Sequence, residues 1–184
     1  MHAVAPAVLA LLLSTAAHSQ QDTLTVRMTA PQAQQALLQA VQRIPAQREE
    51  HRRYRMALPF GSPLFPPDDD LALPPSNPAL AAWLALPADR RRHDVLIAPD
   101  VDYYWNAEGR QYACQFLVHM QALEGGWTQL ALLQVRPSSY AGKSFKLLGR
   151  TGPGYYRDVQ PAAPSLQSAA ELRAFLATAL DQPH

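Results

Sequence analysis

The feature that most constrains the fold is a regular alternation of residue character over residues 112–122. The apolar or small positions are Tyr112, Cys114, Phe116, Val118, Met120 and Ala122, and the positions between them include Gln111, Gln115, His119 and Gln121. Successive side chains of a β-strand point to opposite faces of the sheet. The pattern therefore predicts a strand with one buried face, of the kind found in antiparallel sheets.

The N-terminal half predicts two short strands and two helices. Residues 22–28 alternate as a strand, and Thr29 is predicted to cap a helix with apolar residues at helical spacing that Pro45 ends. Residues 51–58 predict a second strand with an arginine-rich outer face. Residues 77–86 predict a short helix, because Asn77 can cap it and a proline follows in the first turn.

Residues 59–79 lack a sustained period of either kind. The segment is rich in proline and contains three consecutive acidic residues, Asp68, Asp69 and Asp70. Long stretches without regular structure inside a domain are usually functional loops or disordered insertions. We therefore expect a proline-rich loop here.

The C-terminal half is predicted to be mostly strand. Short strands are expected at residues 95–98, 101–105, 127–135, 144–148 and 155–159, with a polar loop at residues 137–143. A last helix is predicted to open at Ser168 and Glu171, which have the spacing of a capping box.

This order of elements predicts the α+β class. We expect a mostly antiparallel sheet of about five to seven strands, with the N-terminal, middle and C-terminal helices packed on one face. The other face is expected to be partly solvated. Residues 20–184 are predicted to form a single domain.

The first residues predict export from the cytoplasm. Residues 3–17 are uncharged and apolar, and Ala17 and Ser19 are small residues at the −3 and −1 positions of a signal-peptidase site. Such a run is too short to span a bilayer but long enough for the core of a signal peptide. We predict a signal peptide at residues 1–19 and a periplasmic or secreted protein; the alternative is an N-terminal anchor helix.

Charge and cysteine content argue against nucleic-acid binding, an internal disulfide and a lipoprotein anchor. The formal net charge is +1, which provides no field that would attract nucleic acid. Cys114 is the single cysteine, so an internal disulfide is impossible, and it lies far from the position that a lipoprotein anchor needs. Its place on the apolar face of the strand predicts that it is buried and unreactive. We expect no membrane span in the mature protein.

The motifs for nucleotide or metal binding are incomplete. Gly142-Lys143-Ser144 matches the end of a phosphate-binding loop, but Pro137 stands where the pattern requires glycine. Asp68–Asp70 with Asp100 and Asp102 have the chemistry of calcium ligands without a calcium-loop pattern, and a solvated acidic loop is the simpler interpretation. The histidines lack the spacing of a zinc site. We predict no cofactor and no metal.

No sequence signature marks a catalytic nucleophile, and no catalytic residue is assigned. There is no Gly-x-Ser-x-Gly elbow. His119, on the polar face of the predicted strand, could act as a base oriented by Asp94 or Asp102, and His51 is a second candidate base. The segment Arg90–His93 is expected to be a solvated turn.

Arginine and aromatic residues at predicted turns and strand faces suit recognition instead. These residue types carry much of the binding energy at interfaces, although aromatic residues are also common in strands for packing reasons alone. The candidate binding residues are Arg53, Arg55, Tyr103, Trp105, Tyr140, Lys143, Tyr155 and Tyr156.

The sequence therefore predicts an exported, non-enzymatic binding protein of the bacterial envelope. One version is an inhibitor or immunity-type protein that inserts the loop at residues 137–143 into the cleft of another envelope protein. One alternative is a small periplasmic hydrolase with a histidine–carboxylate pair. Another is an accessory subunit of an envelope or secretion assembly that docks through residues 59–79.

Overall fold

The computed structural model describes residues 23–42, 56–71, 78–98, 104–105, 111–148 and 152–180. The predicted signal peptide lies outside these residues, and so do several positions considered above: His51, Arg53, Arg55, Asp100, Asp102 and Tyr103. Within the described part of the chain, no helix combines the length and the apolar character needed to cross a membrane.

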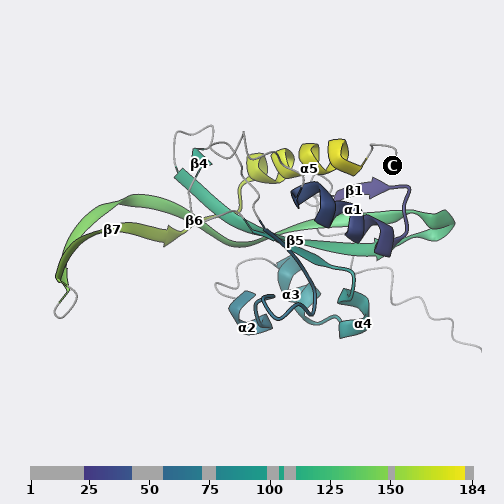
Figure 1. The fold of residues 1–184 in the computed structure, drawn as a ribbon, viewed down its shortest axis with the longest axis horizontal. Helices are drawn as coiled ribbons and strands as arrows, with labels where there is room; N and C mark the ends of the chain where they lie inside the picture. Colours follow the sequence, from purple (N-terminus) through teal and green to yellow (C-terminus); the bar gives the residue numbers. More distant parts are fainter. Residues whose placement is uncertain are drawn as a thin grey trace, which may run out of the picture.

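One antiparallel sheet organises the molecule (Figure 1). It has seven strands with the central order β1-β6-β5-β3-β2, while β4 pairs with β5 and β7 pairs with β6. The strands are β1 (Thr23–Val26), β2 (Met56–Pro59), β3 (Val95–Ala98), β4 (Tyr104–Trp105), β5 (Gln111–Ala122), β6 (Thr128–Leu148) and β7 (Gly152–Pro161). The predicted α+β class with a mostly antiparallel sheet is confirmed.

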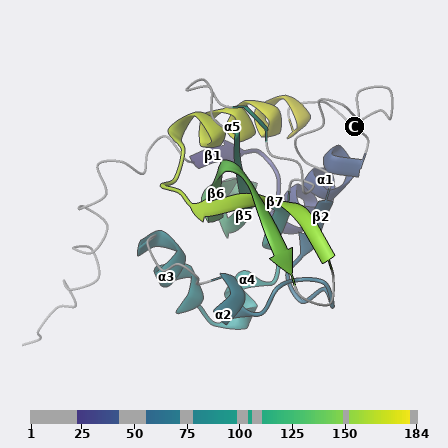
Figure 2. The same cartoon turned by 90° about the vertical axis from the view of Figure 1, so that its left-hand side faces the viewer.

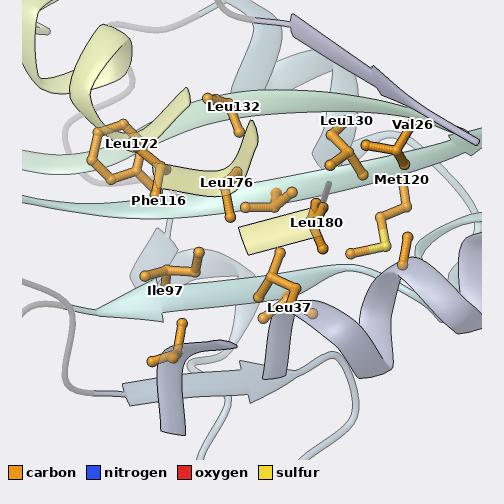
Figure 3. Packing of buried hydrophobic residues seen from close by; sticks show 14 of the residues in the cluster. Val26, Leu37, Ile97, Phe116, Met120, Leu130, Leu132, Leu172, Leu176 and Leu180 are labelled. Carbon is orange, nitrogen blue, oxygen red and sulfur yellow. The ribbon is translucent and has the colours of Figure 1, made fainter. Parts of the chain in front are cut away.

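The two longest helices cover one face of the sheet. These are α1 (Ala30–Gln42) and α5 (Leu166–Leu180), and their buried residues contact the apolar face of β5 (Figure 3). We call this cluster the first core; it contains Val26, Leu37, Val95, Ile97, Phe116, Val118, Met120, Leu130, Leu132, Leu172, Leu176 and Leu180, among others. The alternation predicted for residues 112–122 is confirmed from Tyr112 to Met120, whereas Ala122 at the end of the strand is exposed; Cys114 is buried in this core.

Three short helices lie on the opposite face, as Figure 2 shows. They are α2 (Asp68–Leu71), α3 (Pro78–Leu84) and α4 (Ala88–Arg91). The predicted middle helix, α3, therefore differs from α1 and α5 in the face that it covers. The reason is a second apolar surface made by Leu96, Leu117 and Val135, which Leu71, Leu80 and Trp83 cover to form a second core. Burial of β3 on both faces explains its uninterrupted apolar sequence.

Part of the proline-rich segment is packed rather than projecting. Phe60 and Phe65 contact the second core, and their rings meet edge to face with centroids 5.4 Å apart. Leu71 at the end of α2 is fully buried. In the described part of residues 59–79, these side chains anchor the segment to the sheet.

The caps of the two long helices differ in how well the sequence indicates them. Thr29 precedes α1, and its backbone N–H and hydroxyl both donate to the side-chain oxygen of Gln32. The cap predicted at Ser168 is wrong, because α5 begins at Leu166 and the Ser168 N–H donates to the hydroxyl of Ser165. Ser165 is itself held by Gln134 of β6, which bonds both its N–H and its carbonyl.

The loop predicted at residues 137–143 is instead part of β6. Two irregularities break the alternation there without ending the strand: Arg136 has a φ of 53°, and a bulge falls between Tyr140 and Gly142. Pairing of β6 with β5 ends at Ser139, whereas pairing with β7 continues to Leu148. The two strands therefore leave the sheet together as a two-stranded ribbon, which projects from the body in Figure 1.

Candidate functional site

A fully buried carboxylate lies where three elements meet. Asp94 follows α4 and directly precedes β3, and its side chain is 0 % exposed. It accepts hydrogen bonds from the indole N–H of Trp83 at 2.6 Å and from the backbone N–H of Met120 at 2.9 Å. Its Oδ2 also lies 2.8 Å from Nδ1 of His119. These donors compensate for the removal of the carboxylate from water.

The contact with Asp94 orients the imidazole of His119. An ionised carboxylate can only accept hydrogen bonds, so Nδ1 of His119 is the donor. In the neutral ring the other nitrogen, Nε2, then has a free lone pair. The His119 side chain is 20 % exposed and lines a groove, so the ring connects the buried carboxylate with solvent.

The groove has a volume of about 670 Å³ and lies at the end of the β5–β6 hairpin. Its lining combines the start of α1, the segment from the end of α3 through α4 to His93, and the end of β5. The lining residues with chemical functions or large apolar surfaces are Thr29, Leu86, Asp89, Arg90, Arg92, His93, His119, Met120, Gln121, Leu123 and Trp127. A volume in this range is typical of sites for small organic ligands.

A second histidine borders the same groove. The Nε of Arg92 donates a hydrogen bond to Nε2 of His93 at 3.0 Å. Burial lowers the pKa of His93, and the neighbouring charge of Arg92 lowers it further, while Asp94 opposes the shift. His93 is therefore a neutral hydrogen-bond acceptor at neutral pH.

A glycine turn presents an aromatic ring at the groove. Gly125 and Gly126 have φ values of 71° and 78°, which a side chain disfavours, and Leu123 N–H donates to the carbonyl of Trp127 at 2.7 Å to close the turn. Leu123 and Trp127, two of the most exposed large apolar residues, are each 41 % exposed and line the groove.

Among the described residues that line the groove, His119 has the chemistry of a base, and Thr29 alone offers a hydroxyl that could be a nucleophile. The Thr29 hydroxyl donates to Gln32. A reaction that uses His119 as a base would therefore activate water.

Four of the predicted binding residues come together on the β6–β7 ribbon. Tyr140 and Lys143 lie on β6, and Tyr155 and Tyr156 lie on β7. The register pairs Lys143 with Arg157 and places Ser144 and Phe145 opposite Tyr156 and Tyr155. Trp105 is elsewhere, on β4, where its backbone pairs with Gln111. Arg53, Arg55 and Tyr103 lie outside the described residues.

The prediction of a solvated turn at Arg90–His93 is wrong for Arg91. Arg91 is buried, its guanidinium bonds both carboxylate oxygens of Asp68 at 3.0 and 2.9 Å, and it stacks on Phe60 and Trp83. Its Nε is buried and has no hydrogen-bond partner among the described residues. Arg91 of α4 thus links α2, through Asp68, to two aromatic residues at the second core.

The acidic run at Asp68–Asp70 pairs with arginines. Asp68 bonds Arg91, and Asp70 lies 3.4 Å from Arg136, whose Nε also donates to the Asp70 carbonyl. In the ranges that the structure describes, no three His, Cys, Asp or Glu side chains gather in a way that could hold a metal ion.

Sequence reasoning named His119 and Asp94 as a possible pair, and the structure places them in contact. It assigned no role to Arg92, His93 or Trp127. Trp127 directly follows a Gly-Gly turn, which was the available signal for an exposed aromatic ring. The approach of α4 to the end of β5 has no local signal in the sequence.

Comparison of this chain with known protein families, curated proteins and solved structures finds no match.

Proposed function

We propose that this protein is an exported binding protein of the bacterial envelope that captures another envelope protein with its β6–β7 ribbon. The observation that carries the proposal is the register, which brings Tyr140 and Lys143 onto the same ribbon as Tyr155 and Tyr156. Tyrosine is enriched in the centres of protein interfaces.

The geometry of the ribbon supports a recognition role. Beyond Ser139, the described backbone of β6 pairs with β7 alone. A two-stranded hairpin without a further layer is only marginally stable in water, so a partner that covers it would stabilise it. Its free edges also offer backbone groups for strand addition. An inhibitor-type protein would insert such a ribbon into the cleft of its target.

The binding proposal is tested by shortening the ribbon. The residues between the paired positions Tyr140 and Val159 are replaced by Asn-Gly, a sequence that favours tight hairpin turns. We expect recovery of the crosslinked partner from intact cells to fall by at least about tenfold. The double substitution Tyr140→Ala with Lys143→Ala makes a milder test.

A matched control substitutes the exposed Arg173 on α5 with alanine, which should leave capture unchanged. Circular dichroism establishes that each variant is folded. Equal recovery with the full and the shortened ribbon would remove the ribbon from the binding site. Mass spectrometry of the recovered partner distinguishes an inhibited enzyme from a subunit of a larger assembly.

Export is proposed from the apolar leader and its small residues at Ala17 and Ser19. The expected result is a protein in the periplasmic or secreted fraction whose N-terminus is Gln20. Full-length protein in spheroplasts would contradict the proposal.

A second candidate function is hydrolysis, which the contact of His119 with Asp94 favours. In this reaction Nε2 of His119 accepts a proton from water while the water oxygen attacks an acyl or phosphoryl centre and the leaving group departs. With p-nitrophenyl acetate and p-nitrophenyl phosphate as probes, His119→Gln should lower kcat by about a hundredfold or more. Equal rates for the two proteins would exclude His119 as the base.

A further inference from the structure

The groove carries a basic wall that neither partner capture by the ribbon nor hydrolysis explains. Arg90 and Arg92 are both exposed and both line it, and Asp89 is the one acidic residue among its described lining residues. The second carboxylate nearby, Asp94, lies below the surface with its oxygens bonded to Trp83, His119 and Met120. Its oxygens are bonded to these groups rather than to Arg90 or Arg92, although its charge still acts on His93.

The contact of Arg92 with His93 fixes a donor surface at this wall. Arg92 donates through Nε to the imidazole of His93, and both residues line the groove. The terminal N–H groups of Arg92 make no ion pair with a described carboxylate, and a guanidinium presents donors in a fork that matches carboxylate or phosphate oxygens. Burial is the main cause of the lowered pKa of His93, and the charge of Arg92 adds to it.

Part of the groove lining is apolar. Leu123 and Trp127 are exposed there although each has a large hydrocarbon surface, and Leu86 contributes from the end of the α3 segment. Exposed apolar residues beside a cavity frequently mark a ligand site. The indole face of Trp127 offers a flat surface on which a ring can stack.

We infer that this groove binds an organic anion: a carboxylate or phosphate group bound by Arg92 and Arg90, with an attached ring or hydrocarbon part against Trp127 and Leu123. His119 also lines the groove, and in its neutral ring, with Nδ1 bonded to Asp94, Nε2 can accept a hydroxyl or amide hydrogen. Binding of this anion requires neither capture of a partner by the ribbon nor hydrolysis of the ligand.

The test uses four small probes and the intact mature protein. Phenyl phosphate and benzoate carry both an anion and a ring, inorganic phosphate carries only the anion, and benzyl alcohol carries only the ring. Titrations up to about 10 mM, followed by NMR of the histidine and arginine side-chain nitrogens, report the affinities. We expect phenyl phosphate or benzoate to bind at least about tenfold more tightly than either single-feature probe. The preference between phenyl phosphate and benzoate identifies the anionic group.

Two substitutions separate the parts of the site. Arg92→Gln should weaken the anionic ring probes by about tenfold and leave benzyl alcohol unchanged. Trp127→Ala should reduce the affinity for phenyl phosphate toward that for inorganic phosphate. Arg173→Gln on α5 changes an exposed arginine away from the groove and should have no effect.

The inference is overturned if no ring-bearing anion binds at these concentrations, or if benzyl alcohol binds as tightly as benzoate. It is also overturned if folded Arg92→Gln protein binds benzoate and phenyl phosphate with unchanged affinity. Shortening the ribbon leaves the groove residues in place, so its effect on partner capture is measured independently of this result.

Discussion

Asp94 is hydrogen-bonded to residues from three separate parts of the described structure. Its carboxylate bonds α3 through Trp83 and β5 through His119 and Met120, and its carbonyl accepts the Phe60 N–H at the end of β2. A carboxylate with satisfied bonds in a buried position fixes the positions of its donors, and removal of one partner leaves the others unpaired. The geometry of the groove therefore depends on this residue.

Asp94→Asn is predicted to lower the free energy of unfolding by about 3 kcal/mol, because the amide group faces donors that an N–H₂ cannot satisfy. Urea denaturation measures the loss. Asp89→Asn, at an exposed position on α4, should change stability by less than about 0.5 kcal/mol. Equal stabilities for the two variants would show that the Asp94 network contributes little.

His93 makes stability dependent on pH. Burial and Arg92 hold its pKa below the ordinary value, so the unfolded chain takes up a proton at a higher pH than the folded chain. Stability from this residue is complete above the ordinary pKa and is lost as pH falls toward the lowered one. His93→Gln should therefore show a smaller loss of stability between about pH 7.5 and pH 5.5 than the wild type.

Urea denaturation at the two pH values measures this difference. Other groups titrate in both proteins, so the comparison isolates His93. A larger loss in His93→Gln than in the wild type would reverse the assigned sign.

At the scale of elements, the β5–β6 turn depends on backbone conformation more than on contacts. A Cβ on Gly125 would meet the Trp127 Cδ1 at 3.5 Å, which is ordinary contact, but φ of 71° is unfavourable for alanine. Gly125→Ala is predicted to cost about 1 kcal/mol, and Gly125→Asn less, because asparagine tolerates this conformation better. Urea denaturation of both variants checks the order, and equal costs would point to a steric cause.

Local patterns predicted several elements well. The alternation of β5, the α1 helix after Thr29 and the apolar stripe of Leu172, Leu176 and Leu180 were all readable in the chain. The length of β6 was not, because Arg136 and the bulge after Tyr140 interrupt its period. Such irregularities look like a loop in sequence, and only the pairing with β7 reveals a continuous strand.

The side of the sheet that a helix covers is a property of the whole chain. The uninterrupted apolar run at residues 95–98 fits the burial of β3 on both faces, but the sequence analysis expected only a strand there, and α3 carries no signal of which face it covers. The same holds for the groove: His119 and Asp94 are separated by 25 positions, and their contact depends on the packing of α4 against β5. Site residues that depend on such long-range contacts can be identified only once the fold is known.

At the scale of the whole molecule, the two cores share one sheet. Phe116 and Val118 of β5 belong to the first core and Leu117 to the second, and β3 divides in the same way. Loss of one core removes the support of strands that the other requires. We therefore predict a single cooperative unfolding transition.

Trp83 lies in the second core, whereas α1 and α5 cover the first. In a protein with Trp105→Phe and Trp127→Phe, Trp83 fluorescence and far-ultraviolet circular dichroism should give the same urea midpoint. Loss of the Trp83 signal at lower urea would show that the second core unfolds separately.

The single strand that forms both the body and the arm has a mechanical consequence. Near Thr128 it is flanked by β1 and β5, and past Ser139 it pairs, among the described strands, with β7 alone (Figure 1). A force that pulls the far end of the ribbon acts parallel to β1 and β5, so it loads the hydrogen bonds between these strands and β6 in shear. Hydrogen bonds loaded in shear break together rather than one after another. The sheet would therefore resist a pulling force applied at the ribbon.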